Sequence, residues 1–304
     1  MTTTAPDRFG GALCPTITPF AEGEVSTAGL ETLIEHVIEG GIDGLVPCGT
    51  TGEFASLSAA EYRTVIETTV DVADGRVPVM AGTAGTSVAG TVENVAFAAE
   101  AGADAALITL PYFHTANDEA GNEAFLTAVA DEAALPCYLY NIPSCTGAPI
   151  APETVSTVAD HDSIVGLKDS GGDFTYFQDV VERTPGDFQV YPGSDSLLAW
   201  GLLAGAAGGV CALSNVVPEA FAALVAAVER GDVETATDLQ TGITSLFQAC
   251  VAHGFAPTAK AGLVVRGVLP EATLRPPLVE LDADAREAVE TAVDDVLATV
   301  EAST

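Results

Sequence analysis

The order of local patterns along the chain constrains its fold more than any other feature. Short runs of apolar and β-branched residues alternate with longer Ala- and Glu-rich segments through most of the 304 residues. We interpret eight of these runs as strands, at residues 12–17, 44–48, 77–82, 105–110, 136–140, 164–168, 188–191 and 209–213. Eight strands that are each followed by a helix predict an α/β fold of the (β/α)8 TIM barrel type. A doubly wound open sheet is the alternative.

The helical segments follow the strands at nearly regular intervals. They lie at residues 27–39, 59–72, 88–101, 119–133, 152–158, 174–182, 197–206 and 219–229. The rest of the chain predicts three further helices, the last of them acidic and amphipathic at residues 283–300. Because no linker or low-complexity tract intervenes, we expect residues 1–231 to form the barrel and residues 232–304 a C-terminal helical extension of the same structural unit.

The chain is strongly acidic. Its 43 acidic and 10 basic residues give a formal net charge of -33 at pH 7. Such a charge repels nucleic acids and anionic lipids, so it argues against partners of either class. The acidic residues are dispersed along the helical segments, as at Glu31, Glu35 and Glu39. We interpret them as a solvated surface adapted to high salt, which at 1 M screens charges beyond ~3 Å.

The cysteines and the apolar segments indicate a cytoplasmic protein. The six cysteines include no Cys-x-x-Cys pair, and most lie in apolar runs, which is typical of reduced core residues. Residues 1–10 contain Asp7 and Arg8 and lack an apolar core, so they do not resemble a secretory signal. Residues 196–218 are uncharged, but four glycines divide them, which favours a buried helix and strand over a membrane span.

Lysine is rare in this chain and its placement is informative. The only two lysines are Lys168 and Lys260, and Lys168 ends the apolar strand predicted at 164–168. Burial disfavours the ammonium form and lowers the pKa of an amine, which yields a nucleophile able to form a Schiff base with a carbonyl compound. The alternative, weighed equally from the local sequence, is a lysine at a strand end that reaches solvent or pairs with Asp169.

Other residues that could bind a substrate or take part in catalysis lie at predicted strand ends, where the reactive groups of a barrel collect. Tyr140 ends the strand that precedes the Lys168 strand, so its hydroxyl could carry a proton near that amine; alternatively it makes a structural hydrogen bond. Gly-Thr-Thr-Gly at residues 49–52 offers free N–H groups and hydroxyls for a carboxylate or phosphate. His114 is a weaker candidate for substrate contact. No histidine spacing predicts a metal site, and no nucleotide-binding motif is present.

Taken together, these motifs resemble the dihydrodipicolinate synthase and N-acetylneuraminate lyase superfamily of class I, lysine-dependent pyruvate aldolases. The separation between Tyr140 and Lys168, 28 residues, also matches that pattern. The resemblance covers nearly the whole chain, from residues 15–20 to 275–278, and rests most strongly on residues 49–53, 140–143, 146–147 and 166–170.

The resemblance implies a role for each matching residue. Lys168 forms the Schiff base with a 2-oxo acid, and Tyr140 shuttles the proton. Neither a metal nor an organic cofactor is needed. We expect a small-molecule substrate and, as is common in the superfamily, a homotetramer. The residues implied to contact the substrate are Gly49, Thr50, Thr51, Tyr112, Cys145 and Val210.

Two departures bear on which reaction is catalysed. The synthase usually carries an arginine, which grips the second substrate's carboxylate, where this chain has Cys145, and it has a second tyrosine where this chain has Phe113. A thiol cannot replace a bidentate charged pair. We therefore expect cleavage of 2-keto-3-deoxygluconate, or its 6-phosphate, to pyruvate and a glyceraldehyde in the Entner–Doudoroff route. The alternatives are 4-hydroxy-2-oxoglutarate aldolase, a sugar-acid dehydratase, the synthase itself, or a catalytically inactive barrel that binds 2-oxo acids.

Overall fold

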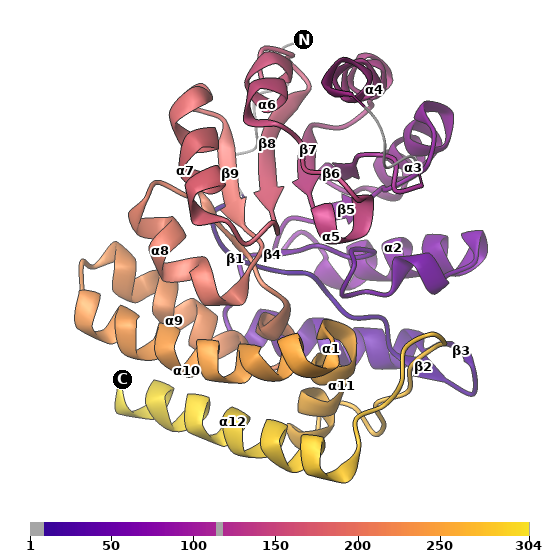
Figure 1. The fold of residues 1–304 in the computed structure, drawn as a ribbon. Helices are drawn as coiled ribbons and strands as arrows, with labels where there is room; N and C mark the ends of the chain where they lie inside the picture. Colours follow the sequence, from indigo (N-terminus) through magenta and orange to yellow (C-terminus); the bar gives the residue numbers. More distant parts are fainter. Residues whose placement is uncertain (1–8, 114–117, 304) are drawn as a thin grey trace.

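The computed structural model describes residues 9–113 and 118–303. Within them, eight parallel strands form a (β/α)8 barrel with helices outside it (Figure 1). The strands are β1 (Gly11–Cys14), β4 (Gly44–Leu45), β5 (Met80–Gly82), β6 (Ala105–Thr109), β7 (Cys137–Asn141), β8 (Ile164–Asp169), β9 (Gln189–Pro192) and β10 (Gly208–Val210). Each strand predicted from the sequence is present.

Hydrogen bonds close the sheet on itself. The strand ladder has two pieces, ordered β10-β1-β4 and β5-β6-β7-β8-β9. Leu45 N donates to Pro78 O at 2.9 Å and joins β4 to the chain entering β5. Ala207 N donates to Val190 O at 3.1 Å and joins the chain entering β10 to β9. Closure removes the exposed strand edges of an open sheet. The predicted barrel is confirmed over the doubly wound alternative.

Eight helices within the described residues cover the barrel. They are α1 (Thr27–Glu39), α2 (Ala59–Ala73), α3 (Val88–Ala101), α4 (Glu119–Glu132), α6 (Pro152–Val158), α7 (Phe174–Arg183), α8 (Leu198–Leu203) and α9 (Pro218–Glu229). The side chains of Ser26, Ser58 and Ser87 accept first-turn N–H groups of α1, α2 and α3. These caps satisfy donors that have no partner inside a helix, which explains why the three helices begin where the sequence predicts.

The inside of the barrel is packed rather than hollow at its N-terminal end. Phe9 inserts there, and its ring centroid lies 5.6 Å from that of Tyr138 in an edge contact. The Tyr191 hydroxyl donates to Phe9 O at 2.7 Å. Leu13 and Met80 fill the same interior cluster. Because side chains fill this end of the barrel, we expect a substrate site at the opposite end, where the strands end.

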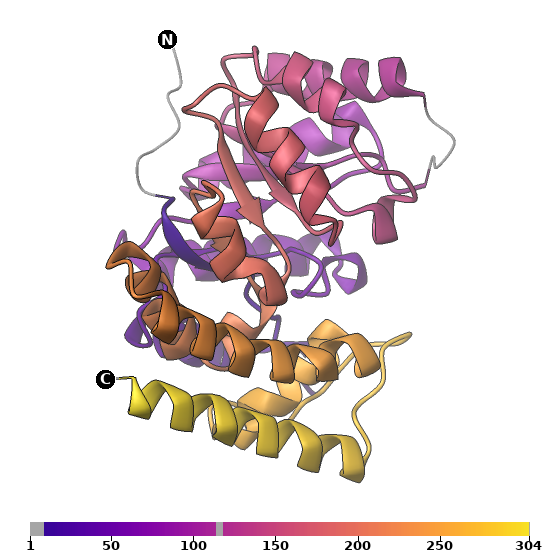
Figure 2. The same ribbon diagram turned by 60° about the vertical axis from the view of Figure 1, so that its left-hand side comes forward.

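The C-terminal region is helical, as expected. It comprises α10 (Val233–His253), α11 (Phe255–Val265) and α12 (Ala283–Ala302), and α10 and α12 run side by side along one flank of the barrel (Figures 1 and 2). Leu239 of α10 and Val293 of α12 belong to the same apolar cluster as Leu33 of α1. This shared cluster supports the proposal that barrel and extension are one structural unit.

Several short elements were not predicted. They are the antiparallel hairpin β2 (Phe20–Ala21) and β3 (Glu24–Val25), helix α5 (Pro143–Thr146), and the 3-10 turns η1 (Phe54–Ser56), η2 (Asp195–Leu197) and η3 (Ala212–Asn215). The predicted strand at 209–213 ends at Val210, because the chain turns into η3 from Ala212. The Asn215 side chain at the end of η3 donates to Pro15 O at 2.9 Å and accepts from Ile17 N at 3.0 Å. No helix among the described residues is both long and apolar enough to cross a bilayer.

Candidate active site

An irregularity in β8 sets the pairing between the two central residues of the site. Cys137 pairs with Ile164, but Tyr138 pairs with Gly166, so Val165 is an extra residue between the two pairs. Without this bulge the register would place Tyr140 opposite Leu167, whose side chain packs against the outer helices. The one-residue shift instead pairs Tyr140 with Lys168. Both side chains therefore point to the inside of the barrel.

Lys168 and Tyr140 are in direct contact. The Lys168 amine lies 4.2 Å from the centroid of the Tyr140 ring, and only 4% of Lys168 and 5% of Tyr140 is exposed. The Tyr140 hydroxyl lies 3.4 Å from Thr50 Oγ1 and 3.5 Å from Ser170 Oγ. An amine, a phenol and two further hydroxyls thus converge at the C-terminal end of the barrel. This arrangement can support carbonyl addition and proton transfer.

The carboxylate of Asp169, the residue after Lys168, hydrogen-bonds to groups other than the Lys168 amine. Asp169 follows Lys168 in β8, so its side chain lies on the other face of the strand. Asp169 Oδ1 accepts from Asn141 Nδ2 at 2.7 Å and from Gly171 N at 2.9 Å. Burial raises the pKa of Asp169 above its ordinary value of 3.8, and these two hydrogen bonds oppose the rise. The pairing of Lys168 with Asp169 that the sequence left open is not what the structure shows.

Two glycines make room for side chains inside the barrel. A Cβ on Gly193 would lie 2.9 Å from Lys168 Cε and 2.2 Å from Ser170 Oγ. A Cβ on Gly166 would lie 2.6 Å from the Tyr138 ring. Such distances are shorter than packed carbon atoms tolerate. Any larger residue at either position would displace the interior side chains beside Lys168.

The Gly-Thr-Thr-Gly-Glu loop follows β4 and is held firmly. Thr18 Oγ1 donates to Gly52 O at 2.7 Å, and Glu53 has a φ of 54°, a left-handed conformation that is uncommon outside glycine. The Glu53 carboxylate pairs with Lys260 Nζ at 2.5 Å, and both side chains are almost completely buried. The second lysine of the chain thus anchors this loop from helix α11.

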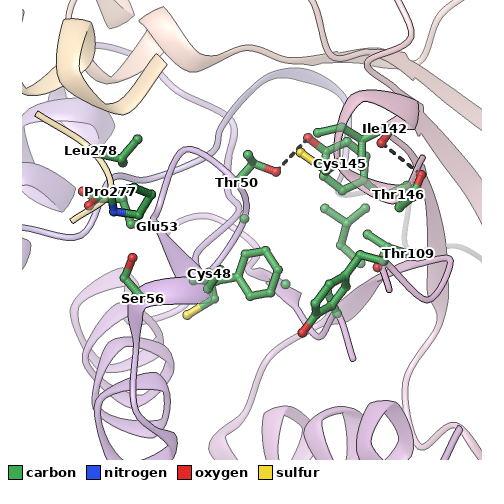
Figure 3. A pocket seen from close by; sticks show the side chains of 18 residues that line it. Cys48, Thr50, Glu53, Ser56, Thr109, Ile142, Cys145, Thr146, Pro277 and Leu278 are labelled. Atoms are coloured by element: carbon green, nitrogen blue, oxygen red, sulfur yellow. Dashed lines mark hydrogen bonds between the residues drawn. The ribbon is translucent and has the colours of Figure 1, made fainter. Parts of the chain in front are cut away.

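A cavity of about 410 Å³ opens beside the Tyr140 hydroxyl. Figure 3 shows Cys145 and Thr146 of α5 on one side of it and Pro277 and Leu278 from the C-terminal region on the other. No described residue that lines this cavity is a lysine or an arginine. Its walls are mainly apolar and hydroxyl-bearing, which suits an uncharged polar ligand.

Most of the residues predicted from the sequence lie at this end of the barrel, but they are not equivalent. Gly49, Thr50, Tyr112, Tyr140 and Cys145 line the cavity. Three others do not line it: Thr51 is a buried residue within the loop, the Lys168 amine lies against the Tyr140 ring, and Val210 belongs to the interior apolar cluster. His114 lies outside the described residues. No group of three His, Cys, Asp or Glu side chains in the described part of the chain is placed to hold a metal ion.

Sequence reasoning missed Ser170, Gly193 and Thr109 as site residues. Ser170 stands two positions after Lys168, which could have signalled it, because it leaves the strand at the same end. Gly193 follows β9 immediately, as Gly49 closely follows β4. Thr109 is the last residue of β6 and carried no motif of its own.

Comparisons with known proteins assign the family. Residues 8–296 match the dihydrodipicolinate synthetase family. The 4-hydroxy-tetrahydrodipicolinate synthase of Syntrophus aciditrophicus is 38% identical over 279 residues, which covers 92% of this chain and 95% of the relative. The chain belongs to the dihydrodipicolinate synthetase family. It is therefore an enzyme, a lyase of the class I pyruvate aldolase superfamily.

Relatives and solved structures of this family extend the similarity. The synthase of Methanopyrus kandleri is 36% identical and covers 92% of this chain, with 94% of its own length matched. The synthase structure from Methylacidiphilum fumariolicum SolV has a TM-score of 0.92 at 32% identity, covering 97% of this chain and 98% of that one. A prophage family member from E. coli K12, solved with pyruvate, has a TM-score of 0.91 at 31% identity, covering 95% and 99%. The relatives' names favour the synthase alternative over the expected sugar-acid aldolase.

Proposed function

We propose that this enzyme forms a Schiff base between Lys168 and pyruvate and uses it to make or cleave a carbon–carbon bond to a short, uncharged hydroxyaldehyde. The corresponding 2-oxo acid is 2-keto-3-deoxygluconate, which yields pyruvate and glyceraldehyde. The observation that carries the Schiff-base chemistry is the placement of the Lys168 amine 4.2 Å from the Tyr140 ring, with the phenol at the cavity.

The mechanism follows from this geometry. The neutral Lys168 amine adds to C2 of the 2-oxo acid, and the Tyr140 hydroxyl gives its proton to the departing oxygen, so that water leaves and an iminium ion and the Tyr140 phenolate remain. The phenolate then accepts the proton of the C4 hydroxyl as the C3–C4 bond breaks, which releases the aldehyde, leaves an enamine on Lys168 and restores the Tyr140 hydroxyl. Protonation of C3 and hydrolysis then free pyruvate and the amine. Thr50, 3.4 Å from the Tyr140 hydroxyl, is placed to hold the carboxylate or to relay the proton.

The choice of an uncharged aldehyde rests on the electrostatics of the cavity. A phosphate or second carboxylate would enter a space whose described lining includes no lysine or arginine. The pyruvate carboxylate is balanced by the iminium ion on Lys168, but a second anion removed from water without a cationic partner is strongly disfavoured. Cys145, exposed at the cavity, supplies a thiol where a synthase would supply a guanidinium. The same obstacle applies to glyoxylate, the aldehyde partner of the hydroxy-oxoglutarate aldolase.

Synthesis of 4-hydroxy-tetrahydrodipicolinate is the second candidate. Relatives that are 35–38% identical over about nine-tenths of the chain carry that name. The reaction would use the same Schiff base with aspartate semialdehyde as the second substrate. It requires a cationic partner for the aldehyde's carboxylate, and no described residue of the cavity lining is a lysine or an arginine.

Borohydride trapping tests the Schiff base. Pyruvate with borohydride should add one pyruvate-derived mass per chain, and peptide mapping should place it on Lys168. Lys260 is the internal control, because 1% exposure and pairing with Glu53 keep it from competing. An active enzyme without an adduct, or an adduct on Lys260, would contradict the proposal.

Substrate choice is tested with a panel of aldehydes and pyruvate in the condensation direction. D-glyceraldehyde should have a higher kcat/KM than its 3-phosphate, aspartate semialdehyde or glyoxylate. Cys145→Arg should shift the preference toward aspartate semialdehyde, whereas the control Cys145→Ala should not. A wild-type enzyme that prefers aspartate semialdehyde would establish the synthase instead.

A further inference from the structure

Thr109 presents a buried hydroxyl to the cavity without a partner. The residue ends β6 and is only 6% exposed, and its Oγ1 makes no hydrogen bond to any described residue. The large majority of buried side-chain polar atoms in proteins have a hydrogen-bond partner, either another protein group or ordered water. The Thr109 hydroxyl lies at a cavity large enough for a ligand, so its expected hydrogen-bond partner is a polar group of that ligand.

The direction of the side chain follows from the alternation of β6. Ala105 and Leu107 belong to the cluster inside the barrel, whereas Ala106 and Ile108 pack against the outer helices. Side chains two residues apart in a strand share a face, so Thr109 points inward with Leu107. Both residues line the cavity, and Figure 3 shows Thr109 at its wall.

Other buried side chains without hydrogen-bond partners are not comparable. Thr16, Thr91 and Asn122 lie away from the cavity lining. Glu53 lines the cavity, but its carboxylate is neutralised by Lys260. Of the described cavity residues with such an atom, Thr109 is the one without a charged partner.

Strand register places Thr109 in a row with the reactive groups. Lys168 pairs with Tyr140 between β8 and β7, and Tyr140 pairs with Thr109 between β7 and β6. Neighbouring strands are separated by ~4.8 Å, so the three side chains follow one another across the barrel mouth. A chain bound to the amine at C2, with its C4 hydroxyl at the phenol, continues toward Thr109.

We propose that Thr109 is a specificity-determining residue whose hydroxyl hydrogen-bonds to a hydroxyl group of the aldehyde portion of the substrate, beyond the reacting carbons. The inference rests on the proposed function and deepens it. Thr109 would select hydroxylated aldehydes over their deoxy counterparts, while the pyruvate portion is bound independently by the residues around Lys168.

The test compares two aldehydes on three proteins. Condensation of pyruvate with D-glyceraldehyde and with propanal, which lacks both hydroxyls, is measured on the wild type, Thr109→Val and Thr109→Ser. Valine keeps the shape and removes the hydroxyl, and serine keeps the hydroxyl. Thr83→Val serves as a matched control, because Thr83 Oγ1 is also buried but donates to Leu107 O at 3.2 Å.

Thr109→Val should lower the ratio of kcat/KM for glyceraldehyde to that for propanal by about tenfold, the scale of one hydrogen bond. Borohydride trapping of pyruvate should be unchanged in this variant, and Thr109→Ser and Thr83→Val should keep the wild-type ratio. An equal fall for both aldehydes, or an unchanged ratio in Thr109→Val, would overturn the role of Thr109 alone. A wild type that traps no pyruvate on Lys168 would instead overturn the proposed function, and the Thr109 inference with it.

Discussion

At the residue scale, Tyr140 combines two contacts that are chemically separable. Its ring lies against the Lys168 amine, and its hydroxyl reaches toward Thr50 and Ser170. The ring contact can stabilise the positive charge of the iminium ion. The hydroxyl is the group that can transfer a proton.

Tyr140→Phe removes only the hydroxyl. We expect this variant to form the borohydride-trapped pyruvate adduct while turnover falls by roughly 10²–10⁴-fold, the usual range for general acid–base assistance. The control is Tyr176→Phe on α7, which loses a hydrogen bond to Ile150 O at 2.8 Å outside the barrel. Turnover near the wild-type value in Tyr140→Phe would assign the hydroxyl to structure.

At the scale of elements, the C-terminal region reaches the site through two ion pairs. Lys260 of α11 pairs with Glu53 and donates to Thr273 O at 2.8 Å. Arg275 pairs with Glu61 of α2 and donates to Ser56 O at 2.8 Å, just after the loop. Helix α11 and the segment between α11 and α12 thereby fix the loop that carries Thr50.

Breaking the buried pair should be costly. Burial lowers the pKa of Lys260, and Glu53 opposes this shift. Lys260→Met would leave the Glu53 carboxylate buried without a cation, so we expect the free energy of unfolding to fall by about 3–5 kcal/mol. Denaturant titration at high salt measures this change in the free energy of unfolding. The double variant with Glu53→Gln should recover much of the loss.

The matched control for this experiment is an exposed pair. Arg286 and Glu280 are both about half exposed, so Arg286→Met should change the free energy of unfolding by less than ~1 kcal/mol. If Lys260→Met were as mild as Arg286→Met, the buried pair would have no role in holding the loop.

The Glu61–Arg275 pair predicts a pH dependence. Arg275 lowers the pKa of Glu61 from its ordinary value of 4.5 to about 2. Because the folded state stabilises the ionised carboxylate, the pair contributes stability above pH 4.5, and the contribution disappears as the pH falls toward 2. The unfolding free energies of wild type and Glu61→Gln should therefore differ most near neutrality and converge in acid. The exposed control Glu290→Gln should leave the unfolding free energy near the wild-type value at neutral pH.

At the scale of the whole molecule, the net negative charge is the main feature that bears on folding stability. A net charge of -33 spread over the surface of a single compact barrel opposes folding by self-repulsion. The described ion pairs use few carboxylates because the chain has only 10 basic residues against 43 acidic ones. Salt tolerance and the homotetramer remain predictions, and one similar solved structure is a monomeric dihydrodipicolinate synthase variant.

Folding should depend on salt. We expect secondary structure and lyase activity to persist in about 2 M KCl, where the screening length is below ~3 Å, and to be lost on dialysis to low salt. Circular dichroism and turnover followed across the same dialysis measure both. Unchanged signals would show that the acidic surface is stable without screening and that the high-salt interpretation is wrong.

Local sequence patterns determined the strands, most helix boundaries and the lysine and tyrosine that we propose to be reactive. Apolar periodicity and capping residues act over a few positions, so they can be recognised along the chain. The family motifs also located Gly49, Thr50, Tyr112 and Cys145 at the site. The hairpin at residues 20–25 and helix α5 were missed because their few residues carry no periodicity.

Only the tertiary structure decided how these residues meet. The bulge at Val165 sets whether Lys168 or Leu167 faces Tyr140, and a one-residue register shift has no local signature. The pair of Glu53 and Lys260 joins residues far apart in sequence. The Thr109 hydroxyl was recognised because no described residue, near or far in sequence, hydrogen-bonds to it. Such features depend on which distant groups share a buried space, and a sequence pattern specifies neighbours along the chain rather than neighbours in space.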